Sequence, residues 1–163
     1  MTFDTQTFRD TLGLFVTGVT IITTRTSNGE PIGITANSFN SVSLNPPLVL
    51  WSIANSSRSI KDFKAAKHYA VHILRDDQMG LSNRFAMSGA DKFKDIKIHN
   101  GLGDTPVLPD CAACLECSVY GHHIAGDHII FVAQVESLQS DSTAQPLVYH
   151  GGRYANLSDQ SQN

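Results

Sequence analysis

The sequence contains no long apolar run, few cysteines and no basic N-terminal segment. No window approaches the roughly 18 to 20 apolar residues that span a bilayer, and the N-terminal MTFDTQTFRD lacks the pattern of a secretory signal. The three cysteines are an odd number, which fits a reducing environment better than a disulfide framework. We therefore expect a cytoplasmic protein that does not bind membranes.

The chain also lacks a dominant charge. Its 12 basic and 15 acidic residues give a net charge of −3 and are scattered, so nothing indicates binding to nucleic acid. A chain of 163 residues with 41% apolar composition is long enough to bury one core. We expect one domain over residues 1–157, followed by a polar tail at 158–163.

Several motifs of common enzyme classes are missing. The sequence has neither GxGxxG nor GxxxxGKS/T, so a nucleotide site here does not use a Rossmann or P-loop device. GxSxG is absent too, and no serine or cysteine carries a local activating pattern. Nucleophilic catalysis therefore finds little support.

Apolar periodicity is the main structural signal that is present. It predicts strands at 19–25, 31–35, 41–44, 48–53, 69–74, 115–124, 128–138 and 146–150. It predicts helices at 5–15, 60–67 and 77–86, the first packed on the domain body through Phe8, Leu12 and Phe15. Because strands and helices do not alternate regularly, the predicted fold class is mainly β, an antiparallel barrel with a few short helices.

Local signals add detail to this barrel. The turn signal Ser27-Asn28-Gly29 joins the first two strands in a hairpin. Two prolines at 46 and 47 remove backbone donors, so strand 41–44 ends there or lies at an edge, and the apolar 48–53 follows as a central strand. Ser59 and Asp62 form a weak capping-box signal for the second helix.

Small polar side chains are concentrated in residues 35–47, TANSFNSVSLNPP. Such residues suit a surface that must hydrogen-bond a ligand, because they neither fill a core nor favour helices. The nearby serines of 55–59, with Arg58, precede a predicted helix, and this arrangement is a candidate phosphate seat. The alternative is that the serines only cap the helix and Arg58 is a solvated surface residue.

Cysteine and histidine provide two further candidate sites. Cys111, Cys114 and Cys117 form CxxCxxC, but side chains three apart on a strand point to opposite faces, which favours ordinary thiols over a metal site. No HxH or HExxH pattern is present, so we expect no histidine metal site. His128 differs from the other histidines because it follows a Gly-Asp turn, where its ring could contact a ligand or shuttle a proton.

Six blocks, taken together, carry a family resemblance. They are GVTIITTR, GITANSFNSVSLNPPLVLWSI, FAMSGADKF, LECSV, AGDHIIFVAQVESL and PLVYHGGRY. In this order and over about residues 8–157, the chain resembles the small flavin reductases that partner two-component monooxygenases. The resemblance implies a split β-barrel of Greek-key type, a homodimer, bound FMN or FAD, and reduction of that flavin by NADH or NADPH. It further implies diffusive transfer of reduced flavin to a larger oxygenase.

The resemblance also implies a set of site residues. The flavin cradle would be Thr35, Ala36, Asn37, Ser38 and Phe39. The phosphate end would be Ser52, Ser56, Ser57, Arg58 and Ser59. Phe85 would lie near the flavin, and the nicotinamide side would be His128, His150, Gly151 and Tyr154. Since the cofactors carry hydride transfer, the protein has to hold the two rings together, and His128 is the candidate catalytic residue that orients the nicotinamide.

Several alternatives stay open at this point. The CAAC segment before LEC has no counterpart in the family pattern, and Ile129 stands where a threonine is common, so the lining of the nicotinamide pocket is undetermined. The flavin could be a released substrate, or it could be retained by a flavoprotein that reduces ferric iron or a cobalamin precursor. A non-catalytic flavin- or heme-binding barrel is a third interpretation. The choices of FMN or FAD and of NADH or NADPH are also open.

Overall fold

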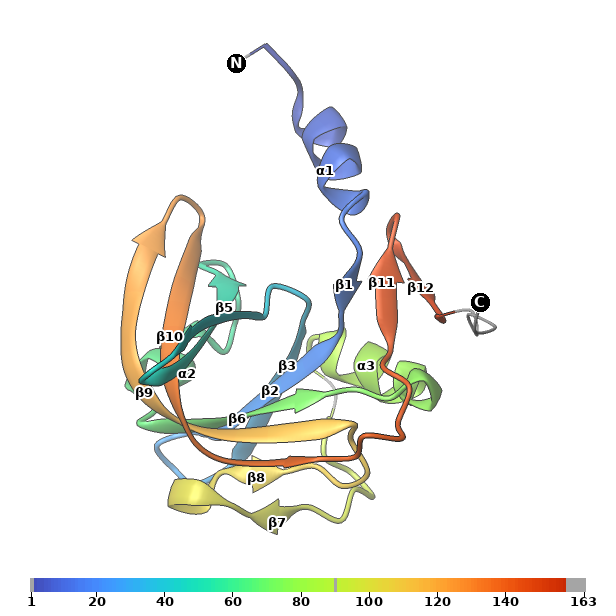
Figure 1. Ribbon diagram of the computed structural model, residues 1–163. Coiled ribbons are helices and arrows are strands. Elements are labelled where there is room, and N and C mark those ends of the chain that lie inside the picture. The colour runs from blue at the N-terminus through green and yellow to red at the C-terminus, as the bar shows by residue number, and fades with distance from the viewer. Residues whose placement is uncertain (1, 90, 158–163) are drawn as a thin grey trace.

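A computed structural model describes residues 2–89 and 91–157, so the predicted tail at 158–163 lies outside the described residues. Its main element is a seven-stranded antiparallel sheet in the order β3-β2-β6-β9-β10-β5-β4 (Figure 1). The strands are β2 (Thr20–Arg25), β3 (Pro31–Ala36), β4 (Asn40–Leu44), β5 (Pro47–Ala54), β6 (His68–Ile73), β9 (Ala113–Ala125) and β10 (His128–Ser140). The mainly β, antiparallel prediction is confirmed.

Smaller elements surround this sheet. A three-stranded sheet contains β1 (Thr17–Gly18), β11 (Val148–His150) and β12 (Arg153–Ala155), and a ribbon pairs β7 (His99–Asn100) with β8 (Pro106–Val107). The helices are α1 (Thr5–Gly13), α2 (Ile60–Ala65) and α3 (Met79–Ala86), with 3-10 turns η1 (Asp76–Gln78) and η2 (Leu102–Asp104). Among the described residues, no helix is long and apolar enough to cross a membrane.

The core inside the sheet is built around Trp51. Its ring stacks on Phe131 at 4.7 Å between ring centroids, and meets Phe63 and Tyr69 edge-on at 5.0 and 5.5 Å. Phe63 is the buried residue of α2, which explains why so short a helix packs against the sheet. Along β5, buried residues alternate with partly exposed ones, so Trp51 points inward while its neighbour Ser52 faces outward.

The sheet curls without closing, which gives the split of the barrel. Strands β3 and β4 are its two edges, as expected for the 41–44 strand, while β5 pairs with both β10 and β4. Beyond the end of β3, the Ser38 hydroxyl donates to the Ser52 carbonyl at 3.0 Å and accepts from the Ser52 N–H at 2.9 Å. The Ser38 side chain therefore connects the end of β3 to β5 across the split, where the two strands do not pair.

Helix α1 differs from the sequence prediction. It projects away from the barrel (Figure 1), and none of its residues is buried. Phe8, Leu12 and Phe15, which were predicted to pack on the domain body, are 49%, 56% and 75% exposed. The apolar spacing correctly predicts a helix with an apolar face, but spacing does not specify what covers that face.

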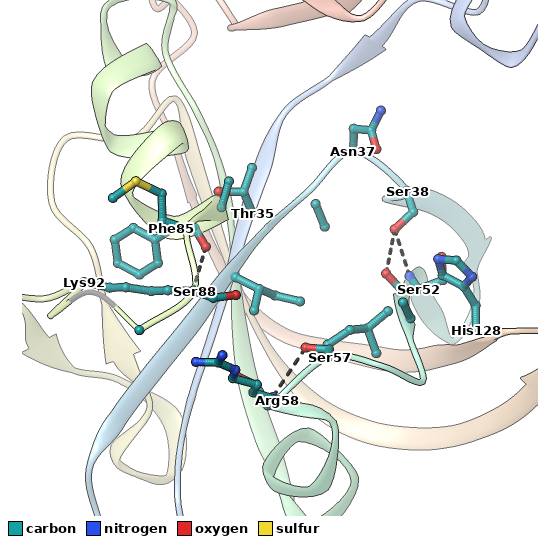
Figure 2. A pocket seen from close by; sticks show the side chains of 18 residues that line it. Thr35, Asn37, Ser38, Ser52, Ser57, Arg58, Phe85, Ser88, Lys92 and His128 are labelled. Carbon is teal, nitrogen blue, oxygen red and sulfur yellow. Dashed lines mark hydrogen bonds between the residues drawn. The ribbon is translucent and has the colours of Figure 1, made fainter. Parts of the chain in front are cut away.

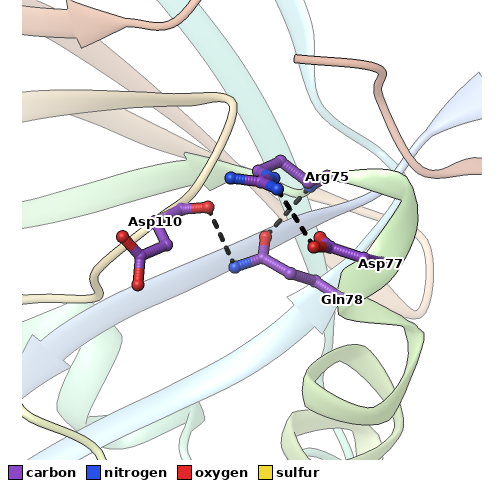
Figure 3. Close-up of polar contacts among 4 residues, drawn as sticks. All are labelled: Arg75, Asp77, Gln78 and Asp110. Carbon is purple, nitrogen blue, oxygen red and sulfur yellow. Dashed lines mark hydrogen bonds and ion pairs between the residues drawn. The ribbon is translucent and has the colours of Figure 1, made fainter.

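Polar contacts at η1 fix the start of α3 (Figure 3). The side-chain oxygen of Gln78 accepts from the Arg75 N–H at 2.9 Å, and its amide donates to the Asp110 carbonyl at 3.2 Å. Arg75 also pairs with Asp77 at 3.0 Å. At the start of α2, by contrast, Ser59 makes no side-chain capping bond, so the predicted capping box is wrong there.

Candidate functional site

A cleft of about 400 Å³ opens at the split of the barrel (Figure 2). Its walls come from the end of β3, from β5, from the turn before α2, from α3 and the loop after it, and from the first residue of β10. Its size is within the range of cofactor pockets. Ten residues predicted from the sequence line it: Thr35, Ala36, Asn37, Ser38, Ser52, Ser57, Arg58, Ser59, Phe85 and His128.

The other five predicted residues lie outside this cleft. Phe39 packs against the core, and Ser56 is exposed in the turn after β5. Gly151 and Tyr154 belong to the C-terminal hairpin and line two neighbouring cavities, while His150 is exposed at the end of β11. The hairpin residues are thus brought next to the cleft but not into it.

Two hydroxyls of the polar stretch hold the cleft together. Thr35 donates to the Ser82 carbonyl of α3 at 2.6 Å, and Ser38 is bonded to Ser52 as described above. A hydroxyl has one proton to donate, so both side chains already use theirs within the protein. Asn37, which is exposed, keeps more of its amide for a ligand, since its one contact is a long 3.4 Å bond to Thr17.

The phosphate-seat end of the cleft is positively charged. Among the described residues that line the cleft, Arg58 and Lys92 are basic, and none is an aspartate or a glutamate. The Arg58 guanidinium reaches the backbone of Gly89, where an added Cβ would be 3.6 Å from Nη1. Gly89 also has φ +79, a conformation that side-chain-bearing residues rarely adopt. This end of the cleft suits an anion such as a phosphate.

Lys92 was missed by the sequence analysis. Its ammonium donates to the carbonyls of Gly33 on β3 at 2.9 Å and of Phe85 on α3 at 2.8 Å, and burial lowers its pKa. An ammonium has three protons, so one remains for a ligand. The glycine at position 33 allows the Phe85 ring to pack closely against β3, because a Cβ at this position would lie 2.6 Å from that ring.

Other residues of the same loop were missed as well. Met87, Ser88 and Gly89 line the cleft beside Lys92. The block FAMSGADKF contained the signal, because a serine, a glycine and a lysine follow a short helix there. Only the fold places that loop against β3, which is more than fifty residues earlier in the chain.

His128 stands at the other end of the cleft, paired with Asp127. The distance from His128 Nδ1 to Asp127 Oδ1 is 2.7 Å, and this hydrogen bond lowers the pKa of the Asp127 carboxyl. Because an ionised carboxylate can only accept, Nδ1–H of His128 donates and Nε2 is left for a ligand. The pair lies in the turn between β9 and β10, where Gly126 has φ +61.

The three cysteines lie away from the cleft. Cys114 and Cys117 pack in different clusters, as expected for strand residues three apart, and all three thiols are free. Burial raises the pKa of Cys111 to about 11 and those of Cys114 and Cys117 to about 12. These are inert packing thiols at neutral pH.

Comparisons with known proteins agree on one family. The model of the flavin reductase-like domain matches residues 12–158. An NADH-dependent FMN reductase of Agrobacterium fabrum is 43% identical over 96% of this chain and 88% of its own. The reductase component of a trigonelline monooxygenase from Acinetobacter baylyi is 40% identical over 90% of this chain, which spans 47% of that longer protein.

A solved structure is similar along its whole length. The NADH:FAD oxidoreductase of Streptomyces globisporus, in complex with NAD and FAD fragments, superposes with a TM-score of 0.92 at 32% identity. The match covers 98% of this chain and 96% of that one. The fold is therefore shared with a protein whose structure was solved in complex with NAD and FAD fragments.

Proposed function

The chain belongs to the flavin reductase-like domain family, and from this we propose that it reduces FMN or FAD with NADH and supplies the reduced flavin to a separate oxygenase. The observation that carries the proposal is the cleft at the barrel split, with serines and two cations at one end and His128 at the other. A flavin mononucleotide has the matching form, with a phosphate at one end and a flat ring system at the other.

The residues of the cleft fit the proposed flavin. Arg58 and Lys92, with Ser57 and Ser59, would hold the phosphate, because they concentrate positive charge and hydroxyl donors without a competing carboxylate. The segment Thr35–Ser38, with Ser52, would run along the ring and the ribityl chain. When bound, the flavin supplies the redox chemistry by accepting a hydride from the reduced nicotinamide.

We place His128 on the nicotinamide side. Its side chain lines the cleft, and Nδ1 is bonded to Asp127, which leaves Nε2 without a partner among the described residues. No strong acid or base is needed for a hydride transfer, and the task of this side chain is to orient the donor. Gly151 and Tyr154, with His150, would complete that side from the C-terminal hairpin.

The composition of the cleft favours a flavin that is released after reduction. Neutral hydroxyls and amides outnumber the two cations, which fits moderate binding more than permanent retention. The sequence similarity to a monooxygenase reductase component agrees with this. A flavoprotein that retains its flavin for another acceptor is the second candidate, and retention of flavin through a desalting column separates the two.

We also propose that the protein is a homodimer. The projecting α1 and the segments that flank it expose six large apolar side chains: Phe3, Phe8, Leu12, Leu14, Phe15 and Val16. A patch of this kind on a monomer usually marks an interaction surface. A second copy of the chain is the partner that the resemblance implies. The three free thiols support a cytoplasmic location, where they stay reduced.

The experiment that tests the proposed activity is NADH and NADPH oxidation by the purified protein, without flavin and then with FMN, FAD or riboflavin. Turnover that rises with added flavin is the expected result, with NADH preferred to NADPH. Oxidation of neither nucleotide under any condition would reject the enzyme and leave a flavin-binding barrel as the better account.

A further inference from the structure

A cavity of about 370 Å³ adjoins the phosphate end of the cleft. Its walls are the first half of β3 and the loop after α3, whereas the cleft lies along the second half of β3. Ser59 and Lys92 line both, so the two cavities meet at residues of the proposed phosphate seat. Figure 2 shows Arg58 and Lys92 together on the side of the cleft away from His128. A ligand that continues past the phosphate seat would therefore enter the adjoining cavity.

The charge of the adjoining cavity differs from that of the cleft. Two acidic residues, Glu30 and Asp91, and one basic residue, Lys92, are among the described residues that line it. The cleft has two basic lining residues and no acidic one among the described residues. Glu30 and Asp91 are both exposed, and neither takes part in the two ion pairs of the described chain. No basic partner therefore neutralises these two carboxylates.

Hydrogen bonds fix the place where the charge changes sign. The ammonium of Lys92 donates to the carbonyls of Gly33 and Phe85, so it stays at the boundary and does not reach into the adjoining cavity. The backbone of Glu30 is held on the other side. Its carbonyl accepts from the Thr26 N–H at 2.9 Å, and its N–H donates to the Thr26 hydroxyl at 3.1 Å.

We propose that Glu30 and Asp91 make this protein select FMN over FAD. FMN ends at its phosphate, whereas FAD continues through a second phosphate to an adenosine. With the first phosphate at Arg58 and Lys92, the second phosphate of FAD lies toward the adjoining cavity, where the two carboxylates repel it. The single phosphate of FMN meets the two cations. This inference rests on the proposed function and deepens it by naming the flavin.

Isothermal titration calorimetry with FMN, FAD and riboflavin tests the selection without any reaction. The unmodified protein should bind FMN more tightly than FAD. Glu30→Gln combined with Asp91→Asn should strengthen FAD binding about fivefold, because it removes like charges at an exposed site, and should change FMN and riboflavin less than about twofold. Asp95→Asn is the matched control in the same loop, exposed and outside both cavities, and should leave all three affinities unchanged.

Salt gives a second measurement, because it screens a repulsion between charges but does not relieve a steric clash. In about 1 M NaCl the gain in FAD affinity should fall below about twofold. A gain that persists there, or an FAD affinity that the double variant leaves unchanged, would overturn the proposal. Weaker FAD binding by the double variant would also overturn it, since the carboxylates would then be binding the adenosine. Failure of the unmodified protein to bind any of the three flavins would instead reject the proposed function.

Discussion

Lys92 and His128 define the two ends of the cleft at the residue scale (Figure 2). The lysine comes from the loop after α3 and the histidine from the start of β10. One offers a positive charge held by two carbonyls, and the other offers a ring nitrogen held by a carboxylate. The two residues should therefore affect different ligands when they are changed.

Lys92→Met should weaken FMN binding about tenfold, because it removes a charge-assisted contact to the phosphate. Riboflavin, which has no phosphate, should lose less than about threefold in affinity. Lys92→Arg is the matched control that keeps the charge. Titration of flavin fluorescence measures both affinities. If the affinity for riboflavin falls as much as the affinity for FMN, Lys92 connects β3 to α3 but does not bind the phosphate.

His128→Ala should raise the KM for NADH about tenfold and leave the affinity for FMN within about twofold, because it acts on the nicotinamide. Asp127→Asn should give a smaller change in the same direction, since it releases the ring without removing it. Steady-state kinetics and a flavin titration separate the two ligands. Equal loss of NADH and flavin binding would exclude the assigned role.

His72 makes stability depend on pH. It is buried, Nδ1 lies 3.0 Å from the Ile21 carbonyl, and Nε2 accepts from the Leu108 N–H at 3.0 Å, so the ring is neutral. Burial lowers its pKa to about 4, below its ordinary value of 6.5. The unfolded chain therefore binds the proton first, and stability falls by up to about 1.4 kcal/mol per pH unit as pH drops from about 6.5 to 4.

Urea unfolding at a series of pH values measures this dependence. His72→Gln should be less stable at neutral pH but should lose less further stability on acidification, because the titrating ring is gone. The same slope in both proteins would contradict the role of His72.

The sequence predicts some of these residues better than others. Ser52 and His128 follow from blocks that resemble a family, and the structure brings both to one cleft. Lys92 acts through the carbonyls of Gly33 and Phe85, and no local pattern connects residues so far apart in the chain. The hydroxyls of Thr35 and Ser38 donate their hydrogen bonds to carbonyls of the protein and not to a ligand, which the composition of the stretch does not reveal.

At the scale of elements, α3 links the two parts of the site. Thr35 of β3 donates to the Ser82 carbonyl of α3, and the Tyr154 hydroxyl of β12 bonds to the Ser82 hydroxyl at 2.8 Å and donates to the Asn83 side-chain oxygen at 3.1 Å. The C-terminal hairpin is thereby tied to the wall of the cleft. Strand β5 was predictable from the nearly continuous apolar run at 48–53, whereas the alternation of burial along it is visible only in the structure. The position of α1 was not predictable, because its apolar face has no partner within the described chain.

Tyr154→Phe should lower the free energy of unfolding by about 1 kcal/mol, because it removes hydrogen bonds between β12 and α3. Urea denaturation measures the change. Tyr120→Phe is the control, since Tyr120 lies on β9 and is 63% exposed. If the two variants are equally stable, the hydroxyl does not anchor the hairpin.

At the scale of the whole molecule, α1 projects from the barrel (Figure 1), and a group of exposed large apolar side chains lies on it and on the segments that flank it. These exposed side chains account for the dimer that we propose, and a monomer would leave them in water. The fold class and the antiparallel sheet were predictable from the sequence. The projecting position of α1 was not, because its exposed apolar side chains have no partner within the described residues.

Changing Phe8 and Leu14 together to glutamate should shift the protein from dimer to monomer, because charge cannot be buried unpaired at an interface. Lys64→Glu is the control, because it places a new negative charge at an exposed position of α2. Size-exclusion chromatography with light scattering gives the mass directly. A dimer that survives both changes would show that this group of side chains is not the interface.

The most direct test of the account is anaerobic mixing of the protein with FMN and an equal amount of NADH, followed by the absorbance of oxidised flavin. We predict that this absorbance disappears as NADH is consumed, one flavin for each nucleotide, and that His128→Ala slows the loss at low NADH. A flavin absorbance that stays constant while FMN is bound would contradict the central claim that this cleft brings flavin and nicotinamide together.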